Sequence, residues 1–191
     1  SSAVVTTLTG LLGASGSADG MGNVARFSNP LGLTSDGAGN LVVADSGNDA
    51  IRIVVQSSAA VTTLAGAASQ RGSTDGSATT SRFHTPCGVT QDAAGNLYVA
   101  DRGNHTVRQF VKSSGSVITL AGAVGNPGSA DGTGVLARFN EPCGIAYDGS
   151  GNLLIADSGN HTLRKLVVGS GVVTTLAGAA GLIGVADGAT A

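Results

Sequence analysis

The chain is poor in the residues on which nucleic-acid binding and membrane insertion commonly depend. Only 12% of its 191 residues are charged, the net charge is −2, 3% are aromatic and tryptophan is absent. Without a basic excess no field attracts phosphate groups, so we expect no nucleic-acid partner. No apolar run approaches the roughly 20 residues of a membrane-spanning helix, so we expect no membrane partner. The opening "SSAVVTTLTG" lacks the features of a signal peptide, and localisation is left open, with an extracellular or secreted setting favoured.

Residues that hold metals and cofactors are also scarce, with three histidines and two cysteines. No Cys–x–x–Cys or His–x–x–x–His pair suggests zinc. Segments such as "DGTG" lack the spaced oxygens of a calcium loop, and the Gly-rich segments open no helix that would hold a phosphate. We therefore expect no cofactor, no metal and no catalytic residue.

Glycine, by contrast, is abundant at 31 residues, and the sequence repeats with a period of 56. The segment "VADRGNHTVRQF" (99–110) recurs as "VADSGNDAIRIV" (43–54) and "IADSGNHTLRKL" (155–166). Residues 57–112 and 113–168 share 29 of 56 positions without a gap. We interpret 1–191 as one repeat domain, with repeats 1–56, 57–112 and 113–168 and a partial fourth repeat, 169–191.

Each repeat carries the pattern of a four-stranded antiparallel meander. In the third, short apolar or alternating runs at 144–148, 153–157, 162–168 and 172–178 are separated by Gly- and Asn-rich turns. A four-stranded sheet repeated around an axis is a blade of a β-propeller. The sequence thus predicts an all-β chain of three four-stranded blades, joined by long links such as 121–142.

The third repeat, "ARFNEPCGIAYDGSGNLLIADSGNHTLRKL" (137–166), resembles the NHL repeat. Its Pro–x–Gly opening, Asp–x–x–Gly–Asn turn and Asp–x–Gly–Asn turn follow in order, and the resemblance extends over essentially the whole chain. The resemblance implies a β-propeller, usually six-bladed. It implies no single function, because NHL propellers include protein-binding platforms, RNA binders, sensor domains and a lyase class.

Three blades do not close a propeller, whereas two chains would supply six. We therefore predict a homodimer with three blades per chain. The segment "VVTTL" occurs at 4–8 and again at 172–176, and each copy suits the outer strand of a third blade. One copy is then surplus, which leaves open a filament built through that strand, or an excerpt from a longer array.

Polar residues that recur in every repeat are interpreted as structural. Ten of the twelve acidic residues do so: Asp19, Asp75, Asp131, Asp187, Asp36, Asp92, Asp148, Asp45, Asp101 and Asp157. We expect Asp36 and its equivalents to accept backbone N–H bonds two residues on, and Asn48, Asn104 and Asn160 to adopt the left-handed conformation. The arginines are expected to pair with carboxylates, at Arg52, Arg108, Arg164, Arg26, Arg82 and Arg138. Phe27, Phe83 and Phe139 are expected to anchor the packing.

The two cysteines, Cys87 and Cys143, occupy the slot that Leu31 fills in the first repeat. A slot that accepts Cys or Leu is a small apolar position, so buried free thiols are predicted. A disulfide would require equivalent sites of neighbouring repeats to approach within about 7 Å, and none is expected.

A binding function is favoured, located where the second-to-third-strand turns and the links 10–29, 66–85 and 122–141 share one face. We call this the link face; its loops are long and variable. Departures from the repeat and the turn histidines give the candidate binding residues Asp49, Arg71, His84, Arg102, His105, Glu141 and His161. The expected partners are a second copy of the chain and a protein or small ligand on this face. A self-assembling structural protein, or an enzyme or metal site in the propeller channel, remain the alternatives.

Overall fold

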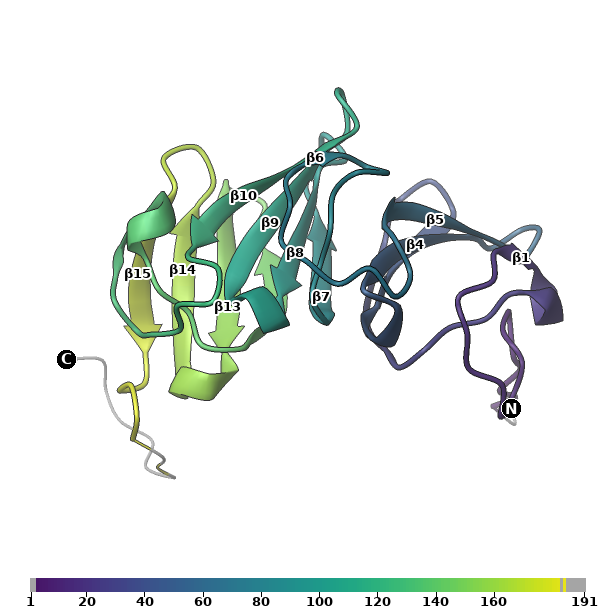
Figure 1. The fold of residues 1–191 in the computed structure, drawn as a ribbon, viewed down its shortest axis with the longest axis horizontal. Helices are drawn as coiled ribbons and strands as arrows, with labels where there is room; N and C mark the ends of the chain where they lie inside the picture. Colours follow the sequence, from purple (N-terminus) through teal and green to yellow (C-terminus); the bar gives the residue numbers. More distant parts are fainter. Residues whose placement is uncertain (1–2, 183, 185–191) are drawn as a thin grey trace.

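The computed structural model describes residues 3–182 and 184, which form three five-stranded antiparallel sheets (Figure 1). Sheet A consists of β1 (Gly20–Met21), β2 (Pro30–Ser35), β3 (Asn40–Asp45), β4 (Ala50–Val55) and β5 (Ala60–Gly66). Sheet B consists of β6 (Gly76–Ser77), β7 (Pro86–Gln91), β8 (Leu97–Asp101), β9 (Thr106–Val111) and β10 (Ser116–Gly122). Sheet C consists of β11 (Gly132–Thr133), β12 (Pro142–Tyr147), β13 (Asn152–Asp157), β14 (Thr162–Val167) and β15 (Val172–Ala177).

The helical content of the described residues is limited to five 3₁₀ turns of three residues each: η1 (Gly22–Val24), η2 (Ser46–Asn48), η3 (Arg102–Asn104), η4 (Gly134–Leu136) and η5 (Ser158–Asn160). None of these elements, within the described ranges, is long and apolar enough to cross a membrane. The predicted all-β class is therefore confirmed.

The meander in each sheet agrees with the sequence pattern, but each sheet has a fifth strand that the pattern did not predict. In sheet A the order is β1-β5-β4-β3-β2. The short strand β1 comes from the link and pairs with β5, Gly20 opposite Val61 and Met21 opposite Ala60. The link thus returns to the outer edge of the sheet that follows it, and the same pairing recurs in sheets B and C. Two residues are too short a run to show a strand period.

The turn between the second and third long strands of each sheet is a 3₁₀ turn that ends in a left-handed residue. That residue is Asp49, His105 or His161, with φ of 52°, 58° and 59°. The prediction that Asn48, Asn104 and Asn160 take this conformation was wrong by one position. Each asparagine is buried within the 3₁₀ turn, where its side chain is used for hydrogen bonding.

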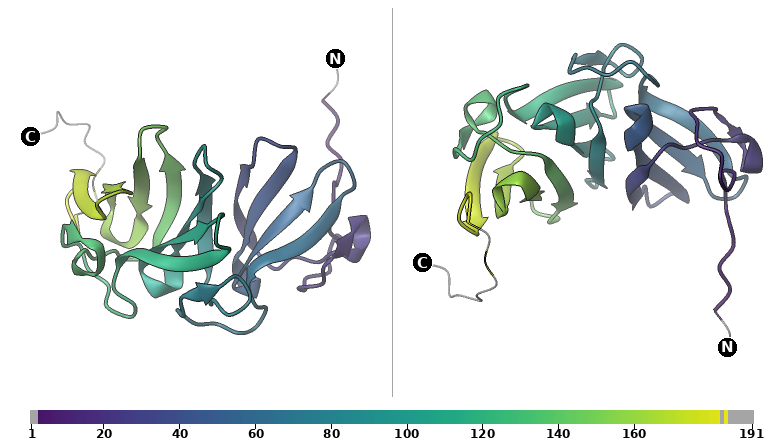
Figure 2. Two further views of the ribbon diagram at one scale, coloured as in Figure 1. Left: turned by 90° about the horizontal axis from the view of Figure 1, so that it is seen from above. Right: turned by 60° about the horizontal axis from the view of Figure 1, so that its bottom comes forward.

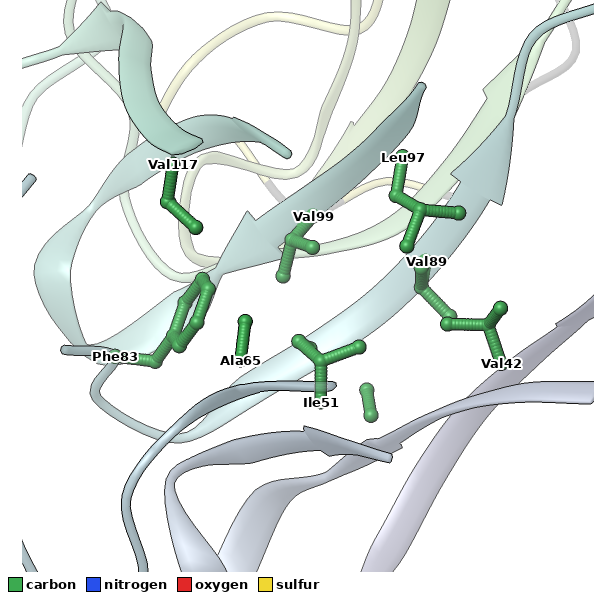
Figure 3. Close-up of a cluster of buried hydrophobic side chains, with 9 residues drawn as sticks. Val42, Ile51, Ala65, Phe83, Val89, Leu97, Val99 and Val117 are labelled. Atoms are coloured by element: carbon green, nitrogen blue, oxygen red, sulfur yellow. The ribbon is translucent and has the colours of Figure 1, made fainter. Parts of the chain in front are cut away.

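The three sheets lie side by side in sequence order along an arc, with the termini at opposite ends (Figure 2). Between sheets A and B, Val42, Ile51 and Ala65 of sheet A face residues of sheet B and of the link before it (Figure 3). Those residues are Phe83 from the link and Val89, Leu97, Val99 and Val117 from sheet B. The equivalent residues of sheets B and C form the next cluster, around Tyr98, Val107 and Phe139. Phe83 and Phe139 are thus the packing anchors that the repeat predicted.

The innermost strands β2, β7 and β12 pack against one another, and this closeness overturns the prediction of free thiols. Cys87 of β7 and Cys143 of β12 form a disulfide with their Cα atoms 5.0 Å apart. The adjacent glycines permit the approach. A Cβ atom on Gly88 would lie 2.2 Å from the carbonyl oxygen of Cys143, and one on Gly32 would lie 2.4 Å from that of Cys87. Equivalent positions of neighbouring repeats come together because inner strands converge toward the centre of the arc.

Of the two "VVTTL" segments, only the second forms a strand, as β15 at the outer part of sheet C. Residues 3–8 have no assigned secondary structure, and Val4 and Val5 are largely exposed. Beyond them, Gly10 donates its N–H to the carbonyl oxygen of Gly22 at 3.0 Å, and Thr9 Oγ1 donates to the same oxygen at 2.9 Å.

Candidate functional site

A buried polar network holds the link to the turn of each sheet, and sheet B illustrates it. Asp101 is fully buried and its Oδ2 accepts bonds from Arg108 Nη1 at 2.9 Å and Asn104 Nδ2 at 2.7 Å. Its Oδ1 accepts the N–H of His84 in the link at 2.8 Å. Arg108 also binds Asp75 of the link at 2.6 Å and stacks on Phe83, 5.3 Å from the ring centroid.

The same contacts recur in sheet A around Asp45 and Arg52 and in sheet C around Asp157 and Arg164. In sheet B, burial raises the pKa of the Asp101 carboxyl to about 6, because desolvation outweighs the attraction of Arg108 and the hydrogen bonds. A raised pKa often marks a functional site. Here the group is enclosed in a threefold-repeated network, and the predicted pairing of Arg52, Arg108 and Arg164 with carboxylates is confirmed.

The other repeated polar residues divide into two groups. Asp36 and Asp148 accept N–H bonds from the residue two positions on, Ala38 at 2.8 Å and Ser150 at 2.7 Å, as predicted. Arg26, Arg82 and Arg138 were expected to pair with carboxylates and instead donate to backbone carbonyls of their own links. Each guanidinium group therefore ties together the last residues of its own link. Asp187 lies outside the described residues.

The links and the 3₁₀ turns share one face, as the strand order requires. In sheet B the N–H of Gly103 donates to the carbonyl oxygen of His84 at 2.8 Å, and Asn104 Nδ2 donates to that of Gly72 at 2.7 Å. The loops of the link face are therefore fixed at both ends on a buried polar network, which is how rigid scaffolds present binding loops.

A cavity of about 420 Å³ lies on the link face and is lined by residues of all three repeats. Its lining consists of Asn29, Leu31, Ser46, Gly47, His84, Thr85, Arg102, Gly103, His105 and Glu141. Four of the candidate binding residues belong to this lining: His84, Arg102, His105 and Glu141. Its volume lies in the usual range of small-molecule sites.

Two further candidates lie near the cavity without lining it: Asp49 contacts the lining residue Thr85, and Arg71 contacts Asp49. Asp49 of sheet A is buried and its Oδ1 accepts the N–H of Thr85 at 2.7 Å. Its Oδ2 lies 3.5 Å from Nε of the exposed Arg71. The equivalent contact one repeat later joins His105 Nδ1 to the N–H of Glu141 at 3.1 Å. In these two turns the left-handed residue thus accepts a backbone N–H of the following repeat.

Glu141 and Arg102 form an exposed ion pair at the edge of the cavity. The hydrogen bond from Arg102, together with its charge, holds the pKa of the Glu141 carboxyl below the ordinary value of 4.5, with a smaller contribution from His105. Each charge occurs in one repeat only. The position of Arg102 is occupied by serine in the other two repeats, at Ser46 and Ser158. The position of Glu141 is occupied by Asn29 and Thr85.

His161, the seventh candidate, lies apart from the others. It is exposed on the outward side of sheet C, beside a second hollow of about 270 Å³ that Leu163 and Gly178 also line. Sequence reasoning missed the cavity residues Asn29, Leu31, Ser46 and Thr85 because they look like ordinary members of the repeat. Their signal was positional: Asn29, Thr85 and Glu141 occupy one slot, and all three have positive φ.

The arrangement on the link face suits noncovalent binding. It offers two imidazole rings, an arginine–glutamate pair and several backbone groups on fixed loops. Among residues 3–182 and 184, no group of three His, Cys, Asp or Glu side chains is placed to hold a metal ion.

Comparison with known sequences supports the repeat assignment. The family model described as NHL repeat matches residues 83–110 and 139–166. NHL repeat-containing protein 2 of Homo sapiens is 41% identical over 163 residues, which are 80% of this chain and 22% of the relative. The protein SUPPRESSOR OF QUENCHING 1, chloroplastic, of Arabidopsis thaliana is 32% identical over 100 residues, 52% of this chain and 9% of the relative. The chain thus spans about a fifth of the human relative.

Solved structures show the same fold. A structural genomics protein of unknown function from Bacteroides thetaiotaomicron is 31% identical with a TM-score of 0.63, over 66% of this chain and 32% of that one. An auxiliary nutrient binding protein from Bacteroides ovatus has a TM-score of 0.64 at 24% identity, over 82% of this chain and 40% of that one. With its repeated sheets, its matched repeats and these propeller-like neighbours, the chain belongs to the NHL-repeat family.

Proposed function

We propose that the chain is a non-enzymatic binding scaffold, with its ligand surface at the link-face cavity, and that chains assemble into a closed six-bladed ring. One observation carries the binding part. Four of the seven candidate residues, chosen mainly because they depart from the repeat, line one cavity of about 420 Å³, and a fifth, Asp49, contacts its lining residue Thr85. The described network of repeated polar residues, by contrast, is buried in structural contacts. The Bacteroides neighbour named as a nutrient binding protein supports a binding role for this fold.

The binding surface can be tested by titrating the ¹⁵N-labelled chain with single probes. A suitable panel contains tripeptides with an acidic, basic or aromatic central residue, and neutral monosaccharides. We expect amide shifts at residues 84–85, 102–105 and 141. Arg102→Ser, which copies Ser46 and Ser158, should weaken binding, whereas Lys112→Ser near the opposite face should not. Shifts confined to turns 36–40, 92–96 or 148–152 would contradict the assignment.

Assembly is supported by the two outward faces of the arc. On sheet C, Leu154 and Leu163 are 41% and 53% exposed, whereas their equivalents Val42 and Ile51 are 2% and 1% exposed beneath sheet B. On sheet A, Leu33 is 65% exposed, whereas its equivalent Val89 is 5% exposed. The outward faces of sheets A and C therefore expose the same apolar positions that are buried between neighbouring sheets inside the chain. Sheet C of one copy fits against sheet A of a second copy, and two such contacts close a ring.

Mixing two variants tests whether sheet C of one copy contacts sheet A of another. Leu33→Glu and Leu163→Glu each place a charge on one outward face without disturbing a buried contact within the chain. Each variant alone should be monomeric by sedimentation velocity, and an equimolar mixture should recover a dimer through its one intact interface. Val135→Glu, on an exposed link residue, is the control and should behave as the parent chain. An open-ended size distribution would favour the filament, and a monomeric parent chain would refute assembly.

A further inference from the structure

A hollow of about 230 Å³ lies between sheets A and B, beside the turns 36–40 and 92–96. Its apolar lining comes from both sheets: Val42, Ile53, Leu64, Leu97 and Phe110. Asp36, Gln91 and Lys112 add polar groups to the lining. In Figure 3, Val42 and Leu97 stand at the end of the buried cluster that is away from Phe83 of the link. The hollow is thus separate from the link-face cavity, with which it shares no lining residue.

Between sheets B and C, the corresponding space is occupied by two aromatic rings. By the period, Tyr98 takes the position of Val42, and Tyr147 takes that of Gln91. The two rings are stacked with their centroids 6.1 Å apart, and Tyr98 is only 1% exposed. The hollow between sheets A and B therefore arises because two smaller or unringed side chains stand where the next interface has tyrosines.

The hydroxyl of Tyr98 shows what the polar end of such a space can bind. Tyr98 Oη donates to Asp92 Oδ2 at 2.8 Å, and Asn96 Nδ2 donates to the same oxygen at 2.9 Å. One repeat earlier, Asp36 Oδ2 accepts the equivalent bond from Asn40 Nδ2 at 2.6 Å. A carboxylate oxygen accepts two hydrogen bonds. Asp36 Oδ2 can therefore accept a hydroxyl in the hollow as Asp92 Oδ2 accepts that of Tyr98.

The charge and the position of Asp36 suit this role. Hydrogen bonds from Asn40 and Ala38 hold the pKa of the Asp36 carboxyl below its ordinary value of 3.8, and the charge of Lys112 contributes less. Asp36 is thus ionised at pH 7, and an ionised acceptor makes a stronger hydrogen bond than a neutral one. Gln91 Nε2 donates to the carbonyl oxygen of Asp36 at 3.3 Å, which connects this turn to sheet B.

We propose that the hollow between sheets A and B is a second ligand site, which takes a small phenol with a single ring. The ring lies among Leu64, Leu97 and Phe110, and its hydroxyl donates to Asp36 Oδ2. The ligand thereby supplies the group that Tyr98 supplies within the chain at the next interface. A volume of about 230 Å³ is below the usual range for drug-sized ligands and suits one ring. This site does not depend on the function proposed for the link face.

Titration of the ¹⁵N-labelled chain with 4-methylphenol, the side-chain analogue of tyrosine, and with toluene tests the site. Toluene lacks the hydroxyl and gains more than the phenol from leaving water, so an apolar hollow alone would prefer toluene. We expect amide shifts at residues 36–42, 91–97 and 110–112. The dissociation constant of 4-methylphenol should be lower than that of toluene by about fivefold or more. Equal or tighter binding of toluene, or an absence of shifts at these residues, would overturn the proposal.

A pair of matched variants isolates the acceptor. Asp36→Asn replaces the carboxylate by an amide of the same shape and should abolish the preference for 4-methylphenol. Asp148→Asn makes the same change at the equivalent turn of sheet C, where Asp148 Oδ2 accepts Asn152 Nδ2 at 2.7 Å. Asp148 does not line the hollow, so this variant should keep the preference of the parent chain. An equal loss of preference in both variants would refute the role of Asp36.

The hollow itself can be closed with the residues of the next interface. The double variant V42Y/Q91Y copies the two tyrosines and, with native circular dichroism, should bind neither ligand between sheets A and B. Unchanged binding would contradict the proposed position of the ring. If the double variant loses its native circular dichroism, the ligand preference of Asp36→Asn decides alone. Failure at this site leaves the link-face proposal standing, because that proposal is measured at residues 84–85, 102–105 and 141.

Discussion

The repeated aspartates have two structural roles, in a buried polar network or at an exposed turn, and their surroundings determine which. Asp101, like Asp45 and Asp157, is fully buried and bound to an arginine, an asparagine and a backbone N–H. Asp36 and Asp148 lie at turns, where they bond backbone groups close in sequence. Removing one partner of a buried pair leaves the other charge without compensation, which costs far more than losing a contact in water.

Asp101→Ala should therefore lower the free energy of unfolding by about 3–5 kcal/mol, because Arg108 and Asn104 lose a buried acceptor. Urea denaturation at pH 7 measures the change. Asp36→Ala, at an exposed turn, is the matched control and should lower the free energy of unfolding much less, because water replaces the lost contacts. An equal loss of unfolding free energy in the two variants would show that the buried network stabilises the fold no more than an exposed turn does.

The Arg102–Glu141 pair predicts a pH response. Because Arg102 lowers the pKa of Glu141, the pair persists below the ordinary pKa of a glutamate and is lost as pH falls through the lowered value. Arg102→Ser should return the Glu141 pKa toward its ordinary value. Glu141 is the sole glutamate of the chain, so one carboxyl carbon resonance reports the titration by NMR. An unchanged midpoint in the variant would show that the pair does not persist in solution.

Among the elements, the inner strands β2, β7 and β12 determine how closely the sheets approach. Glycine in the slots of Gly32 and Gly88 lets one backbone lie against the next, and the disulfide fixes sheet B to sheet C at that point. In the first repeat Leu31 replaces the cysteine. The interface between sheets A and B is therefore held by packing, and that between B and C by packing and a covalent bond.

Reduction of the disulfide should lower the free energy of unfolding by about 4 kcal/mol, the chain-entropy value for a loop of this length. The bond joins residues 56 apart. Urea denaturation with and without dithiothreitol measures the difference. The double variant C87L/C143L, which places the residue of the first repeat in both slots, should be insensitive to the reductant. Equal stability of the oxidised and reduced parent chain would contradict the prediction.

The sequence predicted the elements whose signal is periodic and missed those that depend on distances between sheets. Alternating apolar residues and Gly–Asn turns identified the four long strands of each sheet. The fifth strand is two residues long and carries no period. The disulfide depends on how closely inner strands converge, which no single repeat reveals. The candidate residues were predicted from departures from the repeat, but the cavity that four of them line is formed by residues of all three repeats together.

At the scale of the whole molecule, the chain is an arc with two complementary apolar ends. Its interior interfaces bury residues such as Ile51 and Val107 almost fully, whereas the equivalent Leu163 is half exposed. Burial of such side chains contributes roughly 25 cal/mol per Å² of apolar surface. The proposed assembly would cover these ends by contacts of the same kind as those that hold the three sheets together.

If association stabilises the fold, thermal stability should depend on chain concentration. A tenfold increase in concentration adds about 1.4 kcal/mol to the stability of a dimer relative to its unfolded chains. Differential scanning calorimetry at two such concentrations should show a higher Tm for the parent chain at the higher one. Leu163→Glu, which blocks one end, should show no shift. A Tm that is independent of concentration in both proteins would contradict association.

The return of each link to the outer edge of its own sheet has a consequence for how such chains change in evolution. Because all five strands of a sheet lie within one period of the sequence, from Gly20 to Gly66 in sheet A, a stretch of 56 residues carries all the strand pairings of one sheet. Unequal recombination that adds or removes a stretch of that length creates no new kind of interface. The number of repeats is then free to vary between descendants, while a gain or loss of part of that stretch would leave one sheet without some of its strands.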